Sequence, residues 1–287
     1  MNLKDNTSRR TFLTLATTAA AIPLASAIGL NQNKTSQNEP GKGPGAVRVA
    51  IITGSSRGIG AATARRLALD GYAVTINYLT NKDMAARIAQ EIKSAGGRAI
   101  YRQGDVADPK AVKALFDANQ EAFGGVDVVI SNAGIMNTDP FKDMADDAFD
   151  RMIATNIKGS FNVLREAARR TRDGGRIISL SSSIIQMKPA DTGAYAATKA
   201  AQEMFSGVLA KELAGRRISV NAIAPGAVDT DLLRSKGTAE QLQGAAAITP
   251  YGRLGKPADI ANIIAILCSE NGEWINGQLI YANGGIV

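Results

Sequence analysis

The chain has 287 residues, of which 45% are hydrophobic and 21% charged, and it carries a net charge of +7. This length and composition fit one large α/β domain or two small ones, and they exclude a disordered or fibrous protein. Five of the 33 basic residues and two of the 26 acidic ones lie in the first 45 residues, so the rest carries only +4. Because no basic stripe with interleaved aromatic residues stands out, we expect no nucleic-acid partner.

The chain contains no histidine and a single cysteine, Cys268. Without histidine, Ser-His-Asp catalysis, Cys-His catalysis and metal sites with histidine ligands are excluded, and we expect no bound metal. Cys268 directly follows the apolar helical pattern from Ile260 to Leu267. We therefore expect a buried thiol that takes no part in any chemistry.

The first 27 residues have the features of an export signal. Arg9 and Arg10 precede an uncharged stretch from Thr11 to Asn33, and a small-x-small site ends at Ala27. This pattern is typical of a twin-arginine signal peptide and predicts cleavage after Ala27 and a periplasmic or otherwise exported protein. The alternative is a disordered or amphipathic tail on a cytoplasmic protein. The segment is too weakly hydrophobic for a permanent membrane span.

Residues 28–45 are polar and rich in Gly and Pro, as in a flexible linker. From residue 46 onward, apolar runs alternate with helical patterns. The runs predict strands at Val47–Thr53, Ala73–Asn77, Ala99–Gly104, Val126–Ser131, Arg176–Leu180, Ile218–Ile223 and Gln278–Tyr281. The helical patterns cover Ile59–Leu69, Met84–Ala95, Ala111–Phe123, a broken Ala148–Arg170, Tyr195–Leu213 and Ala258–Leu267.

Strands that alternate with helices indicate right-handed crossovers and a parallel sheet covered on both faces. We therefore predict an α/β fold over residues 46–287. It is a single, doubly wound, Rossmann-type three-layer sandwich with a mostly parallel sheet of about seven strands. No repeat and no long internal linker divides this part of the chain.

A glycine-rich turn with the spacing G-x-x-x-G-x-G follows the first predicted strand. Its glycines let the backbone approach a pyrophosphate, and the next helix offers free N–H groups and a positive dipole end. The turn lacks the Gly-Lys-Ser/Thr of a P-loop, and its spacing differs from the commoner G-x-G-x-x-G. It predicts dinucleotide binding by Gly54, Ser56, Arg57, Gly58, Ile59 and Gly60.

The second predicted strand ends in Asn77 and Tyr78, without the Asp or Glu that usually binds the ribose hydroxyls of NAD. Arg57 and Lys82 are nearby cations that favour the 2′-phosphate of NADP, although both could simply be exposed charges. We expect NADP as the cofactor, with Asn77 and Tyr78 at its adenosine end.

Two further segments follow predicted strands at the same edge of the sheet. Asp105 and Val106 follow the third strand, where a short acid and a backbone amide can meet an adenine edge. Asn132, Ala133 and Gly134 follow the fourth strand and are small enough for the backbone to pass close to a cofactor. We expect all five to bind the cofactor.

Tyr195 and Lys199 are four residues apart, so they lie on one face of a helix. A nearby ammonium favours the phenolate and lowers the tyrosine pKa from its usual value of about 10. Tyr78 and Lys82 have the same spacing, so the spacing alone identifies neither pair. The serine run around Ser182 favours the first pair, because a serine hydroxyl could hold a carbonyl oxygen over the tyrosine.

In their order and spacing, these motifs resemble the short-chain dehydrogenase/reductase family over Val47–Val287. The resemblance implies a catalytic tetrad of Asn156, Ser182, Tyr195 and Lys199. It also implies a segment that closes over the nicotinamide. The cofactor-binding residues that it adds are Pro225, Gly226, Val228 and Thr230, together with Tyr195 and Lys199.

The resemblance implies hydride transfer between nicotinamide and a carbonyl carbon, with Tyr195 exchanging the proton. Lys199 would hold the nicotinamide ribose and lower the tyrosine pKa, and Ser182 would orient the carbonyl. Asn156 and Lys199 would anchor a water that feeds a proton relay.

The choice of Ser182 rests on its position 13 residues before Tyr195, as in many relatives. Ser181 and Ser183 stay open as alternatives. All three serines could also merely satisfy backbone groups at the end of a strand.

By the same resemblance, residues 231–253 would cover the substrate, and their apolar side chains indicate a partly apolar pocket. These side chains are Leu232, Leu233, Leu242, Ile248 and Tyr251. We expect reduction of a ketone or aldehyde to an alcohol, or the reverse, as in 3-oxoacyl reductases and glucose-type dehydrogenases. The alternative is a non-catalytic NADP-binding or scaffold protein that retains the fold.

The resemblance also implies a homotetramer built through the long helices and the last strand. Asn283 stands where many relatives have Asp. We expect this difference to alter a surface or subunit contact more than the chemistry.

Overall fold

The computed structural model describes residues 47–235 and 237–287. The predicted export signal and linker over residues 1–45 lie outside the described residues. The strands are β1 (Val49–Ile52), β2 (Ala73–Tyr78), β3 (Arg98–Gln103), β4 (Val126–Ser131), β5 (Thr171–Leu180), β6 (Ser219–Pro225) and β7 (Leu279–Ala282). All seven predicted strands are present, and the largest difference is at β5, which begins at Thr171 rather than at Arg176.

The helices separate these strands as the alternating pattern predicts. Those on the way to β5 are α1 (Gly58–Leu69), α2 (Lys82–Ser94), α3 (Pro109–Phe123), α4 (Asp146–Met152), η1 (Ile153–Gly159) and α5 (Ser160–Arg170). Those after β5 are α6 (Ile184–Met187), α7 (Gly193–Glu212), η2 (Ala214–Arg216), α8 (Asp231–Arg234), α9 (Ala239–Ala247), α10 (Pro257–Cys268) and η3 (Glu270–Gly272). The short helices α6, α8 and α9 were not predicted.

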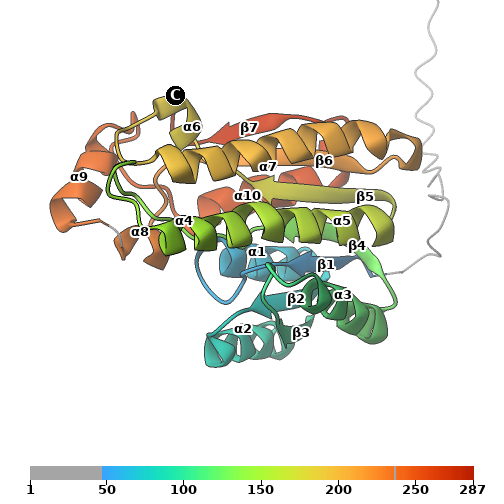
Figure 1. Cartoon of the computed structure of the whole chain (residues 1–287). Helices are drawn as coiled ribbons and strands as arrows, with labels where there is room; N and C mark the ends of the chain where they lie inside the picture. Colours follow the sequence, from blue (N-terminus) through green and yellow to red (C-terminus); the bar gives the residue numbers. More distant parts are fainter. Residues whose placement is uncertain (1–46, 236) are drawn as a thin grey trace, which may run out of the picture. The chain divides into compact units, whose positions relative to one another are not determined.

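The strands form one sheet in the order β3-β2-β1-β4-β5-β6-β7 (Figure 1). Every neighbouring pair is parallel, so the predicted doubly wound fold is confirmed, and the sheet is parallel throughout. The chain runs outward from β1 to β3 and then returns to place β4 on the other side of β1. Ligands of such sheets bind outside the carboxyl ends of the strands at this change of direction.

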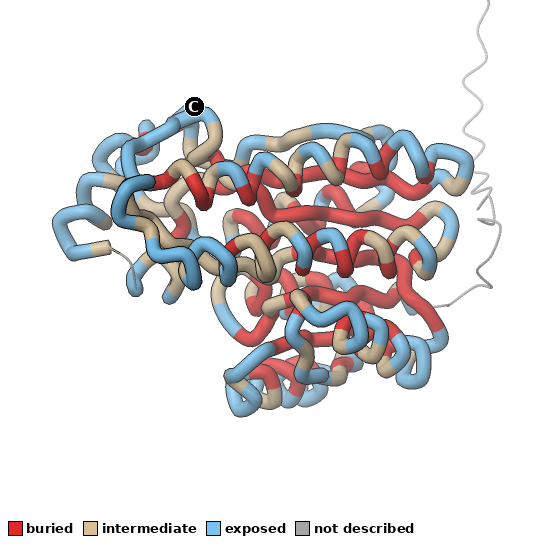
Figure 2. The backbone as a smooth tube through the Cα atoms, in the orientation of Figure 1, coloured by how far each residue is buried: buried red, intermediate tan, exposed pale blue. Residues whose placement is uncertain are grey.

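Helices cover both faces of the sheet because successive strand residues point to opposite sides. Ala50 and Ile52 of β1 pack in one apolar cluster with residues of α1, α2 and α10. Ile51, between them, packs in a second cluster with residues of α3, α5 and α7. Strands buried on both faces read as continuous apolar runs, and Figure 2 shows them as the most buried part of the backbone.

The predicted broken helix over Ala148–Arg170 is continuous but changes its winding. Between α4 and α5, η1 (Ile153–Gly159) is a π-helix. At its end, a Cβ on Gly159 would lie 2.6 Å from Cγ2 of Val106, so glycine permits this close approach. π-helical turns inside α-helices are frequent at functional sites.

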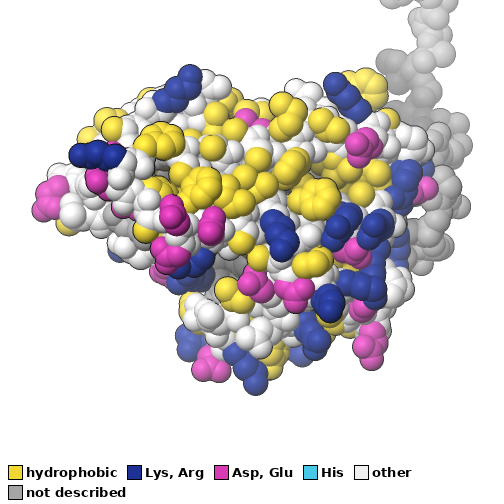
Figure 3. All heavy atoms as spheres, in the orientation of Figure 1, with side chains coloured by type: hydrophobic (Ala, Val, Ile, Leu, Met, Phe, Trp, Pro, Cys, Tyr) yellow, Lys and Arg dark blue, Asp and Glu magenta, His cyan; other side chains and the backbone are white. Residues whose placement is uncertain are grey.

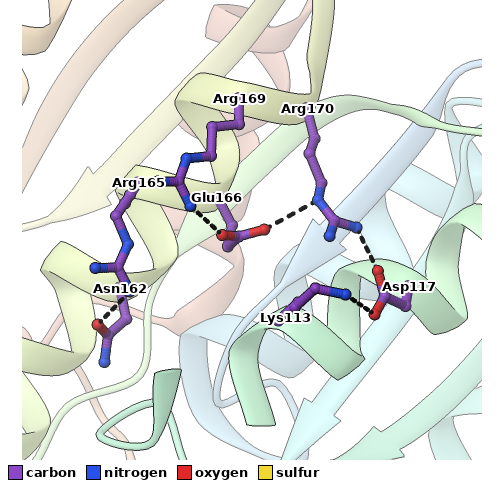
Figure 4. A network of polar contacts seen from close by, with 7 residues as sticks. All are labelled: Lys113, Asp117, Asn162, Arg165, Glu166, Arg169 and Arg170. Atoms are coloured by element: carbon purple, nitrogen blue, oxygen red, sulfur yellow. Dashed lines mark hydrogen bonds and ion pairs between the residues drawn. The ribbon is translucent and has the colours of Figure 1, made fainter. Parts of the chain in front are cut away.

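A network of charged side chains joins α5 to α3 (Figure 4). Arg170 contacts Asp117 of α3 at 2.7 Å and Glu166 of its own helix at 2.9 Å. Hydrogen bonds from Lys113 and Arg170 lower the pKa of the Asp117 carboxyl. The Asp117 side chain is largely exposed, and ion pairs at such positions contribute about 0–1 kcal/mol, whereas Glu166 is buried.

Cys268 lies at the end of α10 and is buried, as predicted. Burial raises the pKa of its thiol to about 12, which keeps the sulfur protonated and unreactive at neutral pH. Within residues 47–235 and 237–287, no helix combines the length and the apolar character needed to cross a membrane.

Candidate active site

A cavity of about 410 Å³ lies at the carboxyl ends of the central strands. Nearly all the residues predicted to bind cofactor or to act in catalysis line it. The exceptions are Gly60, Tyr78 and Asn156, which do not line the cavity.

The glycine turn after β1 brings the backbone to the wall of this cavity. Gly54 and Gly58 adopt φ angles of +60° and +57°, in the left-handed region that favours glycine. A Cβ on Gly54 would lie 2.8 Å from Cα of Ala133, and one on Gly60 would lie 2.6 Å from Nδ2 of Asn132. Gly54 and Gly58 therefore give the glycine turn its backbone shape, which we call the glycine cradle. Gly60 lets α1 pack closely against this turn.

Asn77, at the end of β2, holds the glycine turn in place. Its Oδ1 accepts a hydrogen bond from the backbone N–H of Gly54 at 3.1 Å, and its Nδ2 donates to the Gly104 carbonyl at 3.0 Å. Its own backbone N–H donates to Ser55 Oγ at 3.1 Å. Asn77 lines the cavity, but its side chain is engaged in joining the turn to the neighbouring strand.

Tyr78 does not line the cavity, so the contact with the cofactor that we predict for it stays a prediction. Its ring is buried in an apolar cluster, with its centroid 6.2 Å from that of Tyr101. β2 ends at Tyr78 and α2 begins at Lys82, whose side chain is exposed, so the two do not share a helix. The loop residues 79–81 line this part of the cavity instead. The only signal for them in the sequence is their place directly after a strand.

Arg57 lies at the rim of the cavity, as expected for a residue that meets a cofactor phosphate. Its Nη1 is 3.9 Å from a carboxylate oxygen of Asp231, and both side chains are more than half exposed. A pair this long and this exposed is weak, so the guanidinium keeps its capacity to bind an anion.

Asn156, in the π-turn, is fully buried behind the cavity. Its Oδ1 accepts from the backbone N–H of Ile135 at 2.9 Å, and its Nδ2 donates to the Ile135 carbonyl at 2.8 Å. The same Nδ2 donates to Thr198 Oγ1 at 3.0 Å. The side chain thus fixes the loop after β4 against α7.

Tyr195 and Lys199 lie one turn apart on α7, both buried and both lining the cavity. Lys199 Nζ is 5.8 Å from the centroid of the Tyr195 ring and donates to the Leu180 carbonyl at 2.7 Å. Burial lowers the pKa of Lys199 to about 8. The ammonium is therefore mostly charged at neutral pH.

Burial raises the pKa of Tyr195 to about 12, opposed by a hydrogen bond with Ser182. Loss of hydration is the main cause of this rise, and the expected lowering of the Tyr195 pKa by Lys199 stays a prediction. Tyr195 is protonated at neutral pH and can serve as a proton donor. A phenolate formed there depends on its neighbours for stabilisation.

The three serines after β5 direct their hydroxyl groups differently. Ser181 Oγ donates to Glu203, and Ser183 Oγ donates to the Ala224 carbonyl at 3.1 Å. Ser182 Oγ accepts from the Ile184 N–H at 3.3 Å and is the hydroxyl that bonds Tyr195. This geometry favours Ser182 as the serine beside the reacting group.

The cavity beyond Tyr195 is largely apolar, as the sequence indicates. Leu232 and Leu233 of α8 line it, whereas Ile248 and Tyr251 are 60% and 75% exposed and do not. Leu242 does not line it either. Ile135, Met136, Ile184 and Met187 are among the apolar lining residues that the sequence did not indicate.

Asn283 contacts the serine loop rather than lying apart from it. Its Nδ2 donates to Ser183 Oγ at 3.1 Å, and a Cβ on Gly226 would lie 3.0 Å from Asn283. The side chain therefore supports the loop next to Ser182, which the sequence did not indicate.

The chain is similar to known reductases and dehydrogenases. The family model described as "Enoyl-(Acyl carrier protein) reductase" matches residues 54–287. Versicolorin reductase of Emericella nidulans is 42% identical over 250 residues, covering 83% of this chain and 95% of that protein. NADPH-dependent aldehyde reductase 2 of Arabidopsis thaliana is 40% identical over 253 residues, which cover 83% of this chain and 93% of that protein.

Solved structures show the same arrangement. A short-chain dehydrogenase from Burkholderia cenocepacia in complex with NADP has a TM-score of 0.79 and 37% sequence identity, covering 83% of this chain and 97% of its own. An angucycline C-6 ketoreductase with bound NADP has a TM-score of 0.79 and 34% identity, covering 83% and 95%.

Proposed function

The chain belongs to the short-chain dehydrogenase/reductase family, and on this premise we propose that it is an NADPH-dependent reductase of ketones or aldehydes. The observation that carries the proposal is the buried group of Tyr195, Lys199 and Ser182 at one end of a cavity whose other end is a glycine cradle. The proton donor and the proposed dinucleotide site thus line the same cavity.

The residues present fit NADP. The cradle of Gly54 and Gly58 suits a pyrophosphate, since a side chain at either position would adopt a strained backbone and narrow the turn. β2 ends without a carboxylate, and Arg57 lies at the rim. Relatives of this chain are NADPH-dependent reductases or are crystallised with NADP. When bound, NADPH supplies the hydride that reaches the carbonyl carbon.

The protein's own residues handle the proton. Tyr195 donates its hydroxyl proton to the carbonyl oxygen as the carbon is reduced, so that an alcohol forms and a phenolate remains. Ser182 holds the carbonyl oxygen beside Tyr195, and the Lys199 ammonium stabilises the phenolate until solvent returns the proton. The reverse reaction uses the same groups.

The substrate in this proposal is a largely apolar carbonyl compound. Met136, Ile184, Met187, Leu232 and Leu233 line the cavity, and Met136 and Ile184 pack against the cluster that contains Tyr195. Their side chains offer dispersion contacts rather than hydrogen bonds, and methionine adapts its shape to ring systems. This lining favours an apolar ketone or aldehyde over a sugar.

The test follows NADPH absorbance with a panel of carbonyl compounds, from cyclic and aromatic ketones to small sugars, with both cofactors and in both directions. We expect turnover with NADPH on the apolar members and weaker turnover with NADH. Binding of NADPH without turnover on any member would favour the alternative of a non-catalytic binder or scaffold. Equal or better turnover with NADH would overturn the choice of cofactor.

Export through a twin-arginine route is a second part of the proposal. Its support is in the sequence, where Arg9 and Arg10 precede an uncharged stretch and a small-x-small site ends at Ala27. We expect the mature protein to begin near Ile28 and to be recovered outside the cytoplasm. Full-length protein found only in the cytosolic fraction would contradict this and favour the cytoplasmic alternative.

A homo-oligomer, with a tetramer expected for the family, is the third part. Hydrophobic side chains gather over α5 and α7 (Figure 3). Phe161, Met204 and Val208 are 48%, 67% and 47% exposed, and Phe161 lies against Phe205 at 6.3 Å between ring centroids. An exposed apolar patch of this kind marks an interaction surface. Met204→Glu should reduce the mass measured by light scattering, and a monomeric wild type would refute this part.

A further inference from the structure

Gln202 joins two members of the candidate catalytic group from behind the cavity. It lies on α7, three residues after Lys199, and its side chain is 1% exposed. Its Nε2 donates to the backbone carbonyl of Asn156 at 2.8 Å, and its Oε1 accepts from Lys199 Nζ at 3.3 Å. We infer that Gln202 is a positioning residue for the reduction, because its amide spans the Asn156 carbonyl and the Lys199 ammonium directly.

The Asn156 carbonyl lies in η1, where the winding of the helix departs from that of an α-helix. In an α-helix, the N–H of Ser160 would bond to the carbonyl four residues earlier, that of Asn156. Here the Ser160 N–H bonds to Ile157 instead. A buried carbonyl needs a donor, and Gln202 supplies one from a neighbouring helix.

The chemistry of the two partners fixes the orientation of the amide. A backbone carbonyl only accepts and an ammonium only donates, so only one of the two amide orientations satisfies both contacts. Gln202 therefore links η1 to Lys199 with its amide in a single orientation.

The bridge also fixes the direction of the ammonium. An ammonium has three N–H groups. Lys199 gives one to the Leu180 carbonyl and one to Gln202, which leaves one for the cavity that Lys199 lines. Gln202 thus directs the remaining N–H toward the ligand side.

The family resemblance implies a water between Asn156 and Lys199, and the Gln202 amide is a direct link between the same two residues. The inference rests on the proposed function, since a positioning role needs a reaction to support. It differs from a packing role, because it depends on the donor and the acceptor of the amide and not on its volume.

The test compares two substitutions that separate hydrogen bonding from volume. Gln202→Met keeps the length and most of the volume of the side chain but has no N–H donor and only a weak acceptor. Gln202→Ala removes four non-hydrogen atoms between the Asn156 carbonyl and Lys199, which leaves space for a water, whose share of liquid volume is about 30 Å³. That water would have both polar groups as partners.

We expect Gln202→Met to lower kcat at least about tenfold while the KM for the carbonyl substrate stays within about threefold. We expect Gln202→Ala to keep kcat within about threefold of the wild type, because a water restores the bridge. A packing role predicts the opposite order, since alanine leaves a cavity and methionine fills it. Gln202→Leu is a second apolar variant, which should behave like Gln202→Met.

The matched control is Ser206→Ala. Ser206 is buried on the same helix and donates to the backbone carbonyl of Gln202 at 2.9 Å, so its loss leaves both side-chain contacts of Gln202 intact. Thermal unfolding of every variant confirms that the compared proteins are folded. We expect wild-type kcat for this control.

The outcomes separate this inference from the proposed function. A wild type without turnover would refute the proposed function itself. Two outcomes with an active wild type would overturn the role of Gln202. One is an unchanged kcat in both Gln202→Met and Gln202→Leu, and the other is a lower kcat in Gln202→Ala than in both of them. Loss in the apolar variants with recovery in Gln202→Ala would support it.

Discussion

The segments Tyr195–Lys199 and Tyr78–Lys82 have the same spacing but very different surroundings. α7 carries the first pair on one helix, and both side chains are buried and line the cavity. The second pair is divided between the end of β2 and the start of α2, with the Tyr78 ring in the core and Lys82 exposed. The difference shows that the pair gains chemical meaning from a shared helix and from the groups packed against it.

The groups packed against Tyr195 and Lys199 have no counterpart described for the second segment. Ser182 forms a hydrogen bond with Tyr195, and Lys199 donates hydrogen bonds to the Leu180 carbonyl and to Gln202.

The largest effect is expected for the two lysines. Lys199→Met should lower kcat about 10³-fold, because it removes the charge that stabilises the Tyr195 phenolate and a contact to the ligand. Lys82→Met should keep kcat within about twofold of the wild-type value, since the exposed Lys82 side chain does not line the cavity. Steady-state rates with NADPH and the best carbonyl of the panel give the answer. A comparable loss in both variants would remove the distinction between the segments.

The next effect concerns the serine run. Ser182→Ala should lower kcat about 10²-fold, because Tyr195 and the carbonyl oxygen lose the hydroxyl that holds them together. Ser181→Ala should keep kcat within about threefold of the wild-type value, since the Ser181 hydroxyl donates to Glu203. If Ser181→Ala were the more damaging change, the assignment among the serines would be wrong.

The pH dependence of reduction gives a smaller effect. The pKa of Lys199 is lowered to about 8, so its ammonium is present below that pH and is lost above it. We expect kcat/KM for NADPH, which reports on the free enzyme, to fall by up to about tenfold per pH unit above about pH 8. A buffer series from pH 6 to pH 10 measures it. A rate that stayed constant to pH 10 would show that the charge on Lys199 is not required.

The smallest effect is expected at the far rim of the cavity. Arg57→Ala should raise the KM for NADPH about tenfold and leave the KM for NADH nearly unchanged, because only NADPH carries the 2′-phosphate. kcat should change little, since Arg57 lies in the glycine turn, away from Tyr195 in the chain and on a different element. Equal increases for both cofactors would place Arg57 elsewhere on the dinucleotide.

The sequence was sufficient for the sheet and for the cradle. Parallel strands buried on both faces are continuous apolar runs, and the glycine positions follow from a backbone that only glycine adopts without strain. Tyr195 and Lys199 could be placed because helix spacing is local.

Other features depend on contacts between distant segments, which no local pattern encodes. Tyr78 was expected at the cofactor because it ends β2, yet the alternation of that strand directs its ring into the core. Gln202 appears in the sequence as an ordinary polar residue and Asn77 as a cofactor contact. Their hydrogen bonds to η1 and to the loop after β1 arise only from the fold. The pKa of Tyr195 could not be anticipated either, since it depends on burial and not on the lysine alone.

The most direct test of the account compares NADPH binding and turnover in Tyr195→Phe and Tyr78→Phe. We predict that Tyr195→Phe binds NADPH within about threefold of the wild-type affinity but reduces no carbonyl above about one thousandth of the wild-type rate. Tyr78→Phe should keep wild-type turnover, because its ring is a core residue. Substantial reduction by Tyr195→Phe would contradict the assignment of Tyr195 as the proton donor.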